Sequence, residues 1–142
     1  MCQGVIYLAT DATPWSVGWV ELKDGKVVKT GYEEWKTEED QVIMEMRGFL
    51  IGVRAVTEQR REARIVGVVD AEIVRRVVEK GYSRSPRLRS QLRELRDLVQ
   101  GRQLRVEVGR VTGVDNAADA VSRSDPLEED KVKITWKSLM AM

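Results

Sequence analysis

A chain of 142 residues, 42% of them hydrophobic, is long enough to form one domain with its own core, which excludes an intrinsically disordered segment. It contains one cysteine, Cys2, and no histidine. These counts exclude an internal disulfide framework, a zinc site built from thiolates, and catalysis by a Ser-His-Asp or Cys-His group. Any hydrolytic chemistry must therefore use carboxylates and metal ions.

The net charge of +1 conceals an uneven distribution of charged residues. The stretch from Arg75 to Arg105 contains ten lysines and arginines against three acids, whereas the tail from Asp125 to Asp130 is acidic. A strongly basic segment is typical of a surface that contacts nucleic acid. The apolar stretches are short and the first residues lack a signal-peptide pattern, so we expect an intracellular protein with no membrane span.

The first quarter of the chain predicts an antiparallel meander. Val5–Thr10 is apolar on both faces, as a central strand is, and residues 11–14 (Asp-Ala-Thr-Pro) predict a turn. A second strand is predicted over Trp15–Leu22. Asp24-Gly25 is a strong hairpin signal, and a third strand is predicted over Val27–Trp35.

A long helix is predicted next, from Thr37 to about Gln59. Apolar residues cover most of its circumference and only the side of Arg47 and Arg54 is polar, so this helix should be well buried. Gly48 and Gly52 lie four residues apart on one face. This spacing predicts close packing of the helix against the sheet.

The remaining pattern completes an α/β fold. A strand over 64–69, helices over 71–80 and 86–101, a strand over 104–108 and a short helix ending near 121 follow in order. The element order predicts a five-stranded mixed sheet, with an antiparallel meander joined to parallel strands and helices flanking the sheet. We expect one domain over residues 1–124 and a C-terminal extension over 125–142, whose Trp136 and Leu139 dock on the body.

Four acids stand at points where a metal site could form. Asp11 and Asp70 each end an apolar run, Glu45 lies inside the long helix, and Asp119 opens the last short helix. Such a layout brings oxygen ligands from distant segments to one edge of a sheet. It suits a pair of Mg²⁺ or Mn²⁺ ions, which prefer carboxylates and water, and it indicates cleavage of a phosphodiester.

Each acid also has a purely structural interpretation. Asp11 could start a turn, and Asp70 could cap the following helix. Asp119, in the first turn of its helix, could interact favourably with the helix dipole. Glu45 is harder to explain in this way, because an acid on a nearly all-apolar helix is costly unless it is paired or metal-bound. Asp115 is a possible substitute for Asp119, although an N-cap role suits it better; either Asp115 or Asn116 can cap the last short helix.

Four segments in this order resemble the ribonuclease H domains of retroelement reverse transcriptases. Thr10-Asp11-Ala12 with Gly18-Trp19 resembles the opening of those domains, and Met44–Ala55 is similar to the helix that carries their second acid. Val69-Asp70 with Lys80–Ser85 resembles the third acid and the basic segment after it. Gly113–Arg123 resembles the Asn-x-Ala-Asp-x-x-Ser-Arg ending of retrotransposon enzymes.

The resemblance implies the ribonuclease H-like fold and hydrolysis of the RNA strand of RNA–DNA hybrids with two Mg²⁺ or Mn²⁺ ions. It implies that Asp11 bridges both ions, that Glu45 and Asp70 hold one ion, and that Asp119 holds the other. A polymerase or reverse transcriptase domain is the implied partner. The expected location is the cytoplasm or the nucleus, with the replicating element.

The basic segment supplies candidate contacts to the hybrid. Its cations have few compensating acids nearby in the sequence, which favours phosphate contact over a merely solvated helix face. By analogy with relatives, an amide one turn before Glu45 contacts the minor groove. The candidate nucleic-acid-binding residues are Gln41, Lys80, Arg84, Arg87, Arg89 and Arg93. The four tryptophans are expected to serve packing rather than base stacking.

Two other functions stay open at this point. A non-catalytic scaffold of the same fold, binding nucleic acid or a polymerase partner, is favoured by the absence of histidine, which many relatives place before the last acid, and by Glu72 after the third acid. A DNA nuclease such as an integrase or a junction resolvase would use the same acids. The ending from Asn116 to Arg123 argues against the DNA nuclease.

Overall fold

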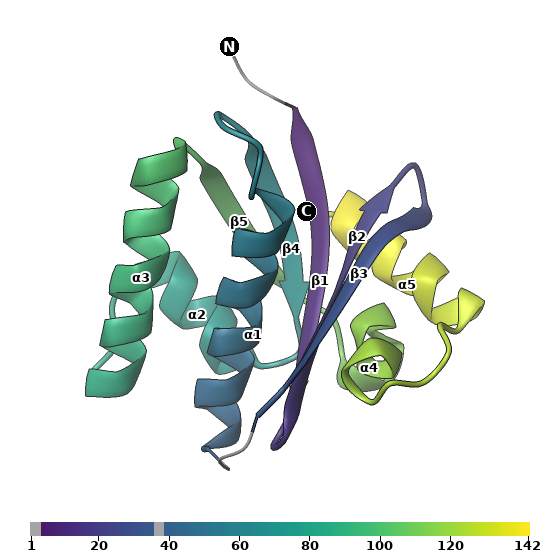
Figure 1. Cartoon of the computed structure of the whole chain (residues 1–142), viewed down its shortest axis with the longest axis horizontal. Coiled ribbons are helices and arrows are strands. Elements are labelled where there is room, and N and C mark those ends of the chain that lie inside the picture. The colour runs from purple at the N-terminus through teal and green to yellow at the C-terminus, as the bar shows by residue number, and fades with distance from the viewer. Residues whose placement is uncertain (1–3, 36–38) are drawn as a thin grey trace.

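The computed structural model describes residues 4–35 and 39–142, which form one five-stranded sheet with helices on both faces (Figure 1). The spatial order of the strands is β3-β2-β1-β4-β5. The strands are β1 (Val5–Thr13), β2 (Ser16–Lys23), β3 (Lys26–Glu34), β4 (Arg64–Val69) and β5 (Arg105–Arg110). This arrangement confirms the predicted order of strands and helices up to residue 122.

The sheet is mixed, as the sequence predicts. β1 pairs with β2 and β2 with β3 in antiparallel fashion, while β1 pairs with β4 and β4 with β5 in parallel. The predicted turn over 11–14 is wrong, because β1 continues to Thr13, which pairs with Ser16 across a two-residue turn. Asp11 therefore lies within a strand, opposite Gly18.

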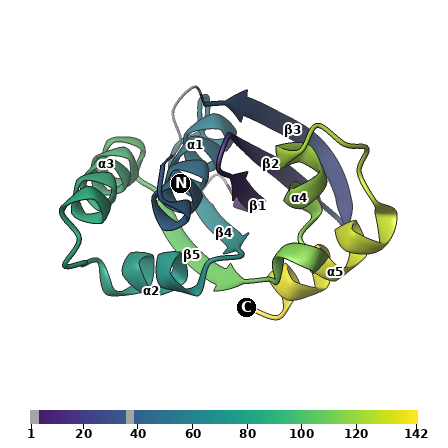
Figure 2. The same cartoon turned by 90° about the horizontal axis from the view of Figure 1, so that it is seen from below.

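Helices α1 (Gln41–Val56), α2 (Glu72–Lys80) and α3 (Pro86–Arg102) cover one face of the sheet, and α4 (Ala117–Ser122) and α5 (Glu129–Met140) cover the other (Figures 1 and 2). Alternate residues of each central strand enter the two cores. Leu8 belongs to the core under α1, whereas the next residue, Ala9, belongs to the core under α4 and α5. A 3₁₀ turn, η1 (Gly113–Asp115), connects β5 to α4.

Helix α1 is shorter than predicted. It begins at Gln41, with the side chain of Asp40 accepting a hydrogen bond from the Val42 backbone N–H, and it ends at Val56. The predicted start at Thr37 lies outside the described residues. The expected burial is confirmed, and so is the glycine face. A Cβ at Gly48 would lie 3.2 Å from Val17 and one at Gly52 would lie 2.7 Å from Thr10, so α1 packs directly on β1 and β2.

Helix α5 was not predicted, although its docking residues were. Leu139 is buried in the second core, and the Trp136 ring packs edge-on against Tyr7, with ring centroids 4.9 Å apart. Trp15, at the β1–β2 turn, is 55% exposed and is therefore not part of the core. Cys2 lies outside the described residues. None of the helices in the described ranges has the length and apolar content that crossing a membrane requires.

Candidate metal centre and nucleic-acid surface

Three of the four acids meet at one edge of the sheet. β1 and β4 run in parallel side by side, so Asp11 on β1 and Asp70 immediately after β4 reach the same end. Glu45 reaches this edge from the second turn of α1. One carboxylate oxygen from each of the three residues lies within 4.8 Å of the other two. The fold thus assembles an all-oxygen cluster from three distant segments.

The Glu45 carboxylate has one hydrogen-bonded oxygen and one buried oxygen without a hydrogen-bond partner among the described residues. Its Oε1 accepts hydrogen bonds from the Ala12 backbone N–H at 3.2 Å and from Gln41 Nε2 at 3.1 Å. Its Oε2 is buried and has no hydrogen-bond partner among the described residues. The residue is only 2% exposed. A buried carboxylate oxygen without a donor is costly, and a cation would satisfy it.

The Asp70 carboxylate is fixed from the side of η1. Its Oδ1 accepts a hydrogen bond of 2.8 Å from the Gly113 backbone N–H. The alternative role as a helix cap is wrong, because Ala71 occupies the N-cap position of α2 without a side-chain bond. A Cβ at Gly113 would lie 3.0 Å from the Asp70 carboxylate, so this close approach favours glycine at position 113.

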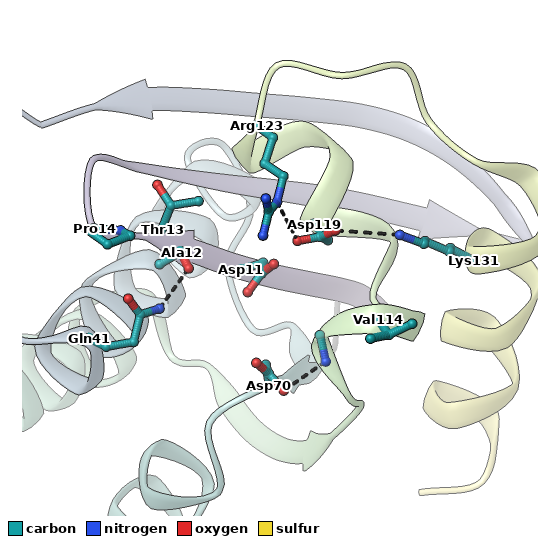
Figure 3. Close-up of a pocket in the computed structure, with 11 residues that line it drawn as sticks. Asp11, Ala12, Thr13, Pro14, Gln41, Asp70, Val114, Asp119, Arg123 and Lys131 are labelled. Carbon is teal, nitrogen blue, oxygen red and sulfur yellow. Dashed lines mark hydrogen bonds and ion pairs between the residues drawn. The ribbon is translucent and has the colours of Figure 1, made fainter.

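Asp119 approaches the cluster from the opposite face of the sheet. It lies in the first turn of α4, and Figure 3 shows Asp11 between Asp119 and Asp70. Its Oδ1 lies 3.1 Å from Arg123 Nε and its Oδ2 lies 3.5 Å from Lys131 Nζ. Both carboxylate oxygens therefore face a cation as well as the pocket.

A glycine and an asparagine place α4 beside β1. Gly18 lies against the backbone of Ser122, so any side chain at position 18 would push α4 away. Asn116 donates from Nδ2 to the Thr10 carbonyl at 2.9 Å and caps α4 by accepting from the Ala118 N–H. Of the two predicted N-cap residues, Asn116 is therefore confirmed, and an N-cap role of Asp115 is wrong.

The side chain of Asp115 instead accepts a hydrogen bond of 2.9 Å from Thr112 Oγ1. Asp115 does not line the pocket that holds Asp11, Asp70 and Asp119. Of the two candidates for the fourth acid, Asp119 is the one that the fold directs at the cluster.

Burial is the main cause that raises the pKa values of the two innermost acids, Asp11 and Glu45. Burial, followed by the charges of Glu45 and Asp119, raises the pKa of Asp11 from 3.8 to about 9. Burial likewise raises the pKa of Glu45 from 4.5 to about 7. Burial also opposes ionisation of Asp119, but Arg123, with help from Lys131, outweighs it and lowers the pKa of Asp119. The Asp11–Glu45 pair therefore retains a proton at neutral pH unless a cation replaces it.

The residues present fit a site for Mg²⁺ or Mn²⁺. The donor set is entirely carboxylate oxygen, which these ions prefer, and Glu45 Oε2 is buried without a partner in the described part of the chain. The pocket of about 470 Å³ next to the cluster is open to solvent on one side and leaves room for water ligands. Asp11, Glu45 and Asp70 could hold one ion, and Asp11 with Asp119 could hold a second.

Known structures match this architecture. No family model and no curated protein matches the sequence. Among solved structures, ribonuclease H1 of the archaeon Halobacterium salinarum is similar with a TM-score of 0.71 and 20% identity, over 85% of this chain and 96% of that chain. LC11-RNase H1 in complex with an RNA/DNA hybrid gives a TM-score of 0.69 and 14% identity, over 85% and 94% of the two chains. The chain has the ribonuclease H-like fold.

A viral polyprotein also contains this ribonuclease H-like fold. The foamy viral protease-reverse transcriptase in complex with an RNA/DNA hybrid is similar with a TM-score of 0.55 and 10% identity. The match covers 76% of this chain but only 17% of the viral chain, so it corresponds to one module of a larger enzyme. The predicted fold class is thereby confirmed.

The predicted nucleic-acid contacts fall into two groups in this ribonuclease H-like fold. Gln41 lines the acid pocket, where its Nε2 donates to the Ala12 carbonyl at 2.8 Å. The cations lie on α2, on α3 and between them, and α3 begins at the end of the molecule where β1 and β4 end (Figure 1). Exposed side chains in this group are Lys80, Arg84, Arg87, Arg89 and Arg93.

One of these cations is already paired. Both guanidinium nitrogens of Arg87 donate to the carboxylate of Glu39, with distances of 2.5 and 2.6 Å. The expectation that Arg87 lacks a compensating acid is therefore wrong, because Glu39 is distant in sequence and adjacent in space. Glu72, whose sequence position favours a scaffold, is likewise engaged by Arg75 at 2.5 Å.

The structure adds residues that the sequence did not single out. Arg76 and Tyr82 line a shallow pocket together with Lys80 and Arg84, and the Tyr82 side chain is 58% exposed. Helical spacing places Arg76 and Lys80 on one face of α2, a signal available in the sequence. At the acid pocket the unanticipated lining residues are Val114, Arg123 and Lys131.

Proposed function

We propose that this protein is a metal-dependent ribonuclease H that hydrolyses the RNA strand of RNA–DNA hybrids. The observation that carries the proposal is the cluster of Asp11, Glu45 and Asp70, with oxygens within 4.8 Å of one another, at a pocket edge of a ribonuclease H-like fold. Two of the similar structures are bound to an RNA/DNA hybrid, which supports the same class of substrate for this chain.

The residues divide the work between metal binding and substrate placement. Two divalent ions bound here would activate a water molecule and stabilise the leaving oxygen of the phosphodiester. Asp11 is the shared ligand in this scheme because it lies between Asp70 and Asp119 (Figure 3). Gln41 orients Glu45 through the hydrogen bond to Oε1. Exposed cations on α2 and α3 hold backbone phosphates.

A reverse transcriptase is the proposed context of the domain. The ending from Gly113 to Arg123 resembles that of retrotransposon enzymes, and the foamy viral protease-reverse transcriptase has this fold as one module. In this proposal a polymerase domain presents the hybrid, with the chemistry taking place in the cytoplasm or nucleus where the element replicates. Addition of such a polymerase domain is then expected to increase the rate of cleavage.

Cleavage of a labelled RNA–DNA hybrid in Mg²⁺ and in Mn²⁺ tests the function. The Asp70→Asn variant should lose at least about a thousandfold of the rate, because it removes a charged ligand from the cluster. Asp97→Asn, the same chemical change on the exposed side of α3, should keep full activity. Cleavage that survives Asp70→Asn would refute the proposal that this acid cluster catalyses the reaction. Tight hybrid binding without cleavage in either metal would favour the non-catalytic scaffold.

A further inference from the structure

Helix α5 delivers a cation to the acid pocket. Lys131 Nζ lies 3.5 Å from Asp119 Oδ2 and 2.7 Å from Glu128 Oε2, and Lys131 lines the pocket together with Asp11 and Asp70. Figure 3 shows its side chain reaching from α5 toward Asp119. The residue lies beyond Arg123, where the last of the four segments that resemble ribonuclease H domains ends.

The position of Lys131 is fixed by the body of the protein. Thr135, one turn further along α5, is fully buried. Its hydroxyl accepts from the Ala117 backbone N–H at 2.9 Å and donates to the Asp115 carbonyl at 3.1 Å. Together with buried Leu139, these bonds lock α5 onto η1 and α4. Lys131 is therefore held at the pocket by a docked helix and is not a mobile tail residue.

Neutralising Asp119 does not by itself account for Lys131. Arg123 already lies 3.1 Å from the other Asp119 oxygen, closer than Lys131 does. An ammonium group has three N–H donors, and Asp119 and Glu128 are its two ion-pair partners in the described part of the chain. The Lys131 side chain is 23% exposed, and it lines the acid pocket. At least one of its three N–H donors is therefore not engaged by these ion pairs and can reach an anion that enters the pocket.

We propose that Lys131 binds a backbone phosphate of the nucleic acid strand that lies across the acid pocket. This inference rests on the proposed function and deepens it, because it makes the C-terminal extension part of the substrate-binding site. A lysine suits such a contact as a compact point charge that tolerates several phosphate positions. The acidic cluster would bind the metal ions, and Lys131 with Arg123 would form the cationic side of the same pocket.

The salt dependence of hybrid binding tests this contact. Loss of one phosphate contact lowers the slope of log K against log salt concentration by about 0.9, which is roughly a tenfold loss of affinity at 0.1 M salt. We expect this change for Lys131→Gln, measured by fluorescence anisotropy with a labelled hybrid in EDTA, where no cleavage occurs. Lys131→Arg should retain the slope of the parent chain.

Lys133→Gln is the matched control, because it removes the same charge from an exposed position on the same helix. It should leave the slope unchanged. Equal slopes for Lys131→Gln and Lys133→Gln would overturn the inference, and thermal unfolding of both variants checks that α5 stays docked. If the parent chain cleaves hybrid but Lys131→Gln binds hybrid like the parent, the Lys131 contact is refuted and the proposed function stands. If the parent neither binds nor cleaves hybrid, the proposed function fails with it.

Discussion

Replacing Glu45 with glutamine should stabilise the metal-free protein. The Oε1 atom of the introduced glutamine side chain would still accept the hydrogen bonds from the Ala12 N–H and from Gln41. The new amide N–H₂ would replace Oε2, which is buried without a partner in the described residues, and would donate toward the neighbouring carboxylates. The substitution therefore keeps the existing bonds and removes a buried negative charge from the cluster.

The size of the effect follows from the raised pKa of Glu45. Burial raises this pKa from 4.5 to about 7, and each pKa unit corresponds to about 1.4 kcal/mol. Below pH 4.5 the carboxyl is protonated in both folded and unfolded chains, and it costs nothing. Between pH 4.5 and 7 only the unfolded chain releases the proton, so the free energy of unfolding falls as pH rises. Above pH 7 the full cost of about 3 kcal/mol is present.

Urea unfolding in EDTA at pH 4.5 and pH 8 measures this difference. Glu45→Gln should match the parent chain at pH 4.5 and exceed its free energy of unfolding by about 3 kcal/mol at pH 8. Glu94→Gln, at an exposed position of α3, should change neither value. Saturating Mg²⁺ should stabilise the parent more than Glu45→Gln, which lacks one carboxylate ligand. An equal effect of Glu45→Gln at both pH values would refute the reasoning.

Two further predictions concern metal binding and the seat of α4. A metal ion must displace the proton held by Asp11 and Glu45, whose pKa values are raised, so Mg²⁺ affinity should increase as pH rises from 6 to 8. Calorimetry in buffers of different ionisation enthalpy measures the proton release, and a Mg²⁺ affinity independent of pH would contradict the shared proton. Gly18→Ala should lower the free energy of unfolding by about 1–3 kcal/mol, because its Cβ would push α4 off the sheet, and it should also slow cleavage. Gly101→Ala, in open space on α3, should raise the free energy of unfolding by up to about 1 kcal/mol in urea. Equal stability of the two variants would show that α4 does not need the close approach.

The sequence predicts the sheet and most helices because their signals are local. Alternating and continuous apolar runs identify each strand, and the nearly all-apolar face of α1 identifies a buried helix. The end of β1 was misplaced because Asp11 resembles the start of a turn, whereas the turn begins at Pro14 and Thr13 still pairs with Ser16 on the next strand. Helix α5 was not predicted, although Val132, Trp136 and Leu139 recur at the i, i+4, i+7 spacing of one helix face and lie together at the second core.

The sequence predicts those parts of the candidate site that lie at the ends of strands. Asp11 and Asp70 end apolar runs, and parallel neighbours bring such ends together. The pairing of Arg87 with Glu39 joins residues 48 positions apart, which no local pattern reveals. The contact of Lys131 with Asp119 depends on how α5 docks over α4. Charge partners set by helix docking therefore required the structure.

The short length of α4 makes the Asp119 side of the acid pocket the part that unfolds most readily. Six residues are too few for a stable isolated helix, so α4 depends on the Asn116 bond to β1 and on α5 for its order. Local unfolding of this one segment would remove Asp119 and leave the Asp11–Glu45–Asp70 group intact within the central sheet. The Asp11–Glu45–Asp70 part of the pocket should therefore stay folded when α4 unfolds locally. Faster amide hydrogen exchange in α4 than in the central strands would show this difference.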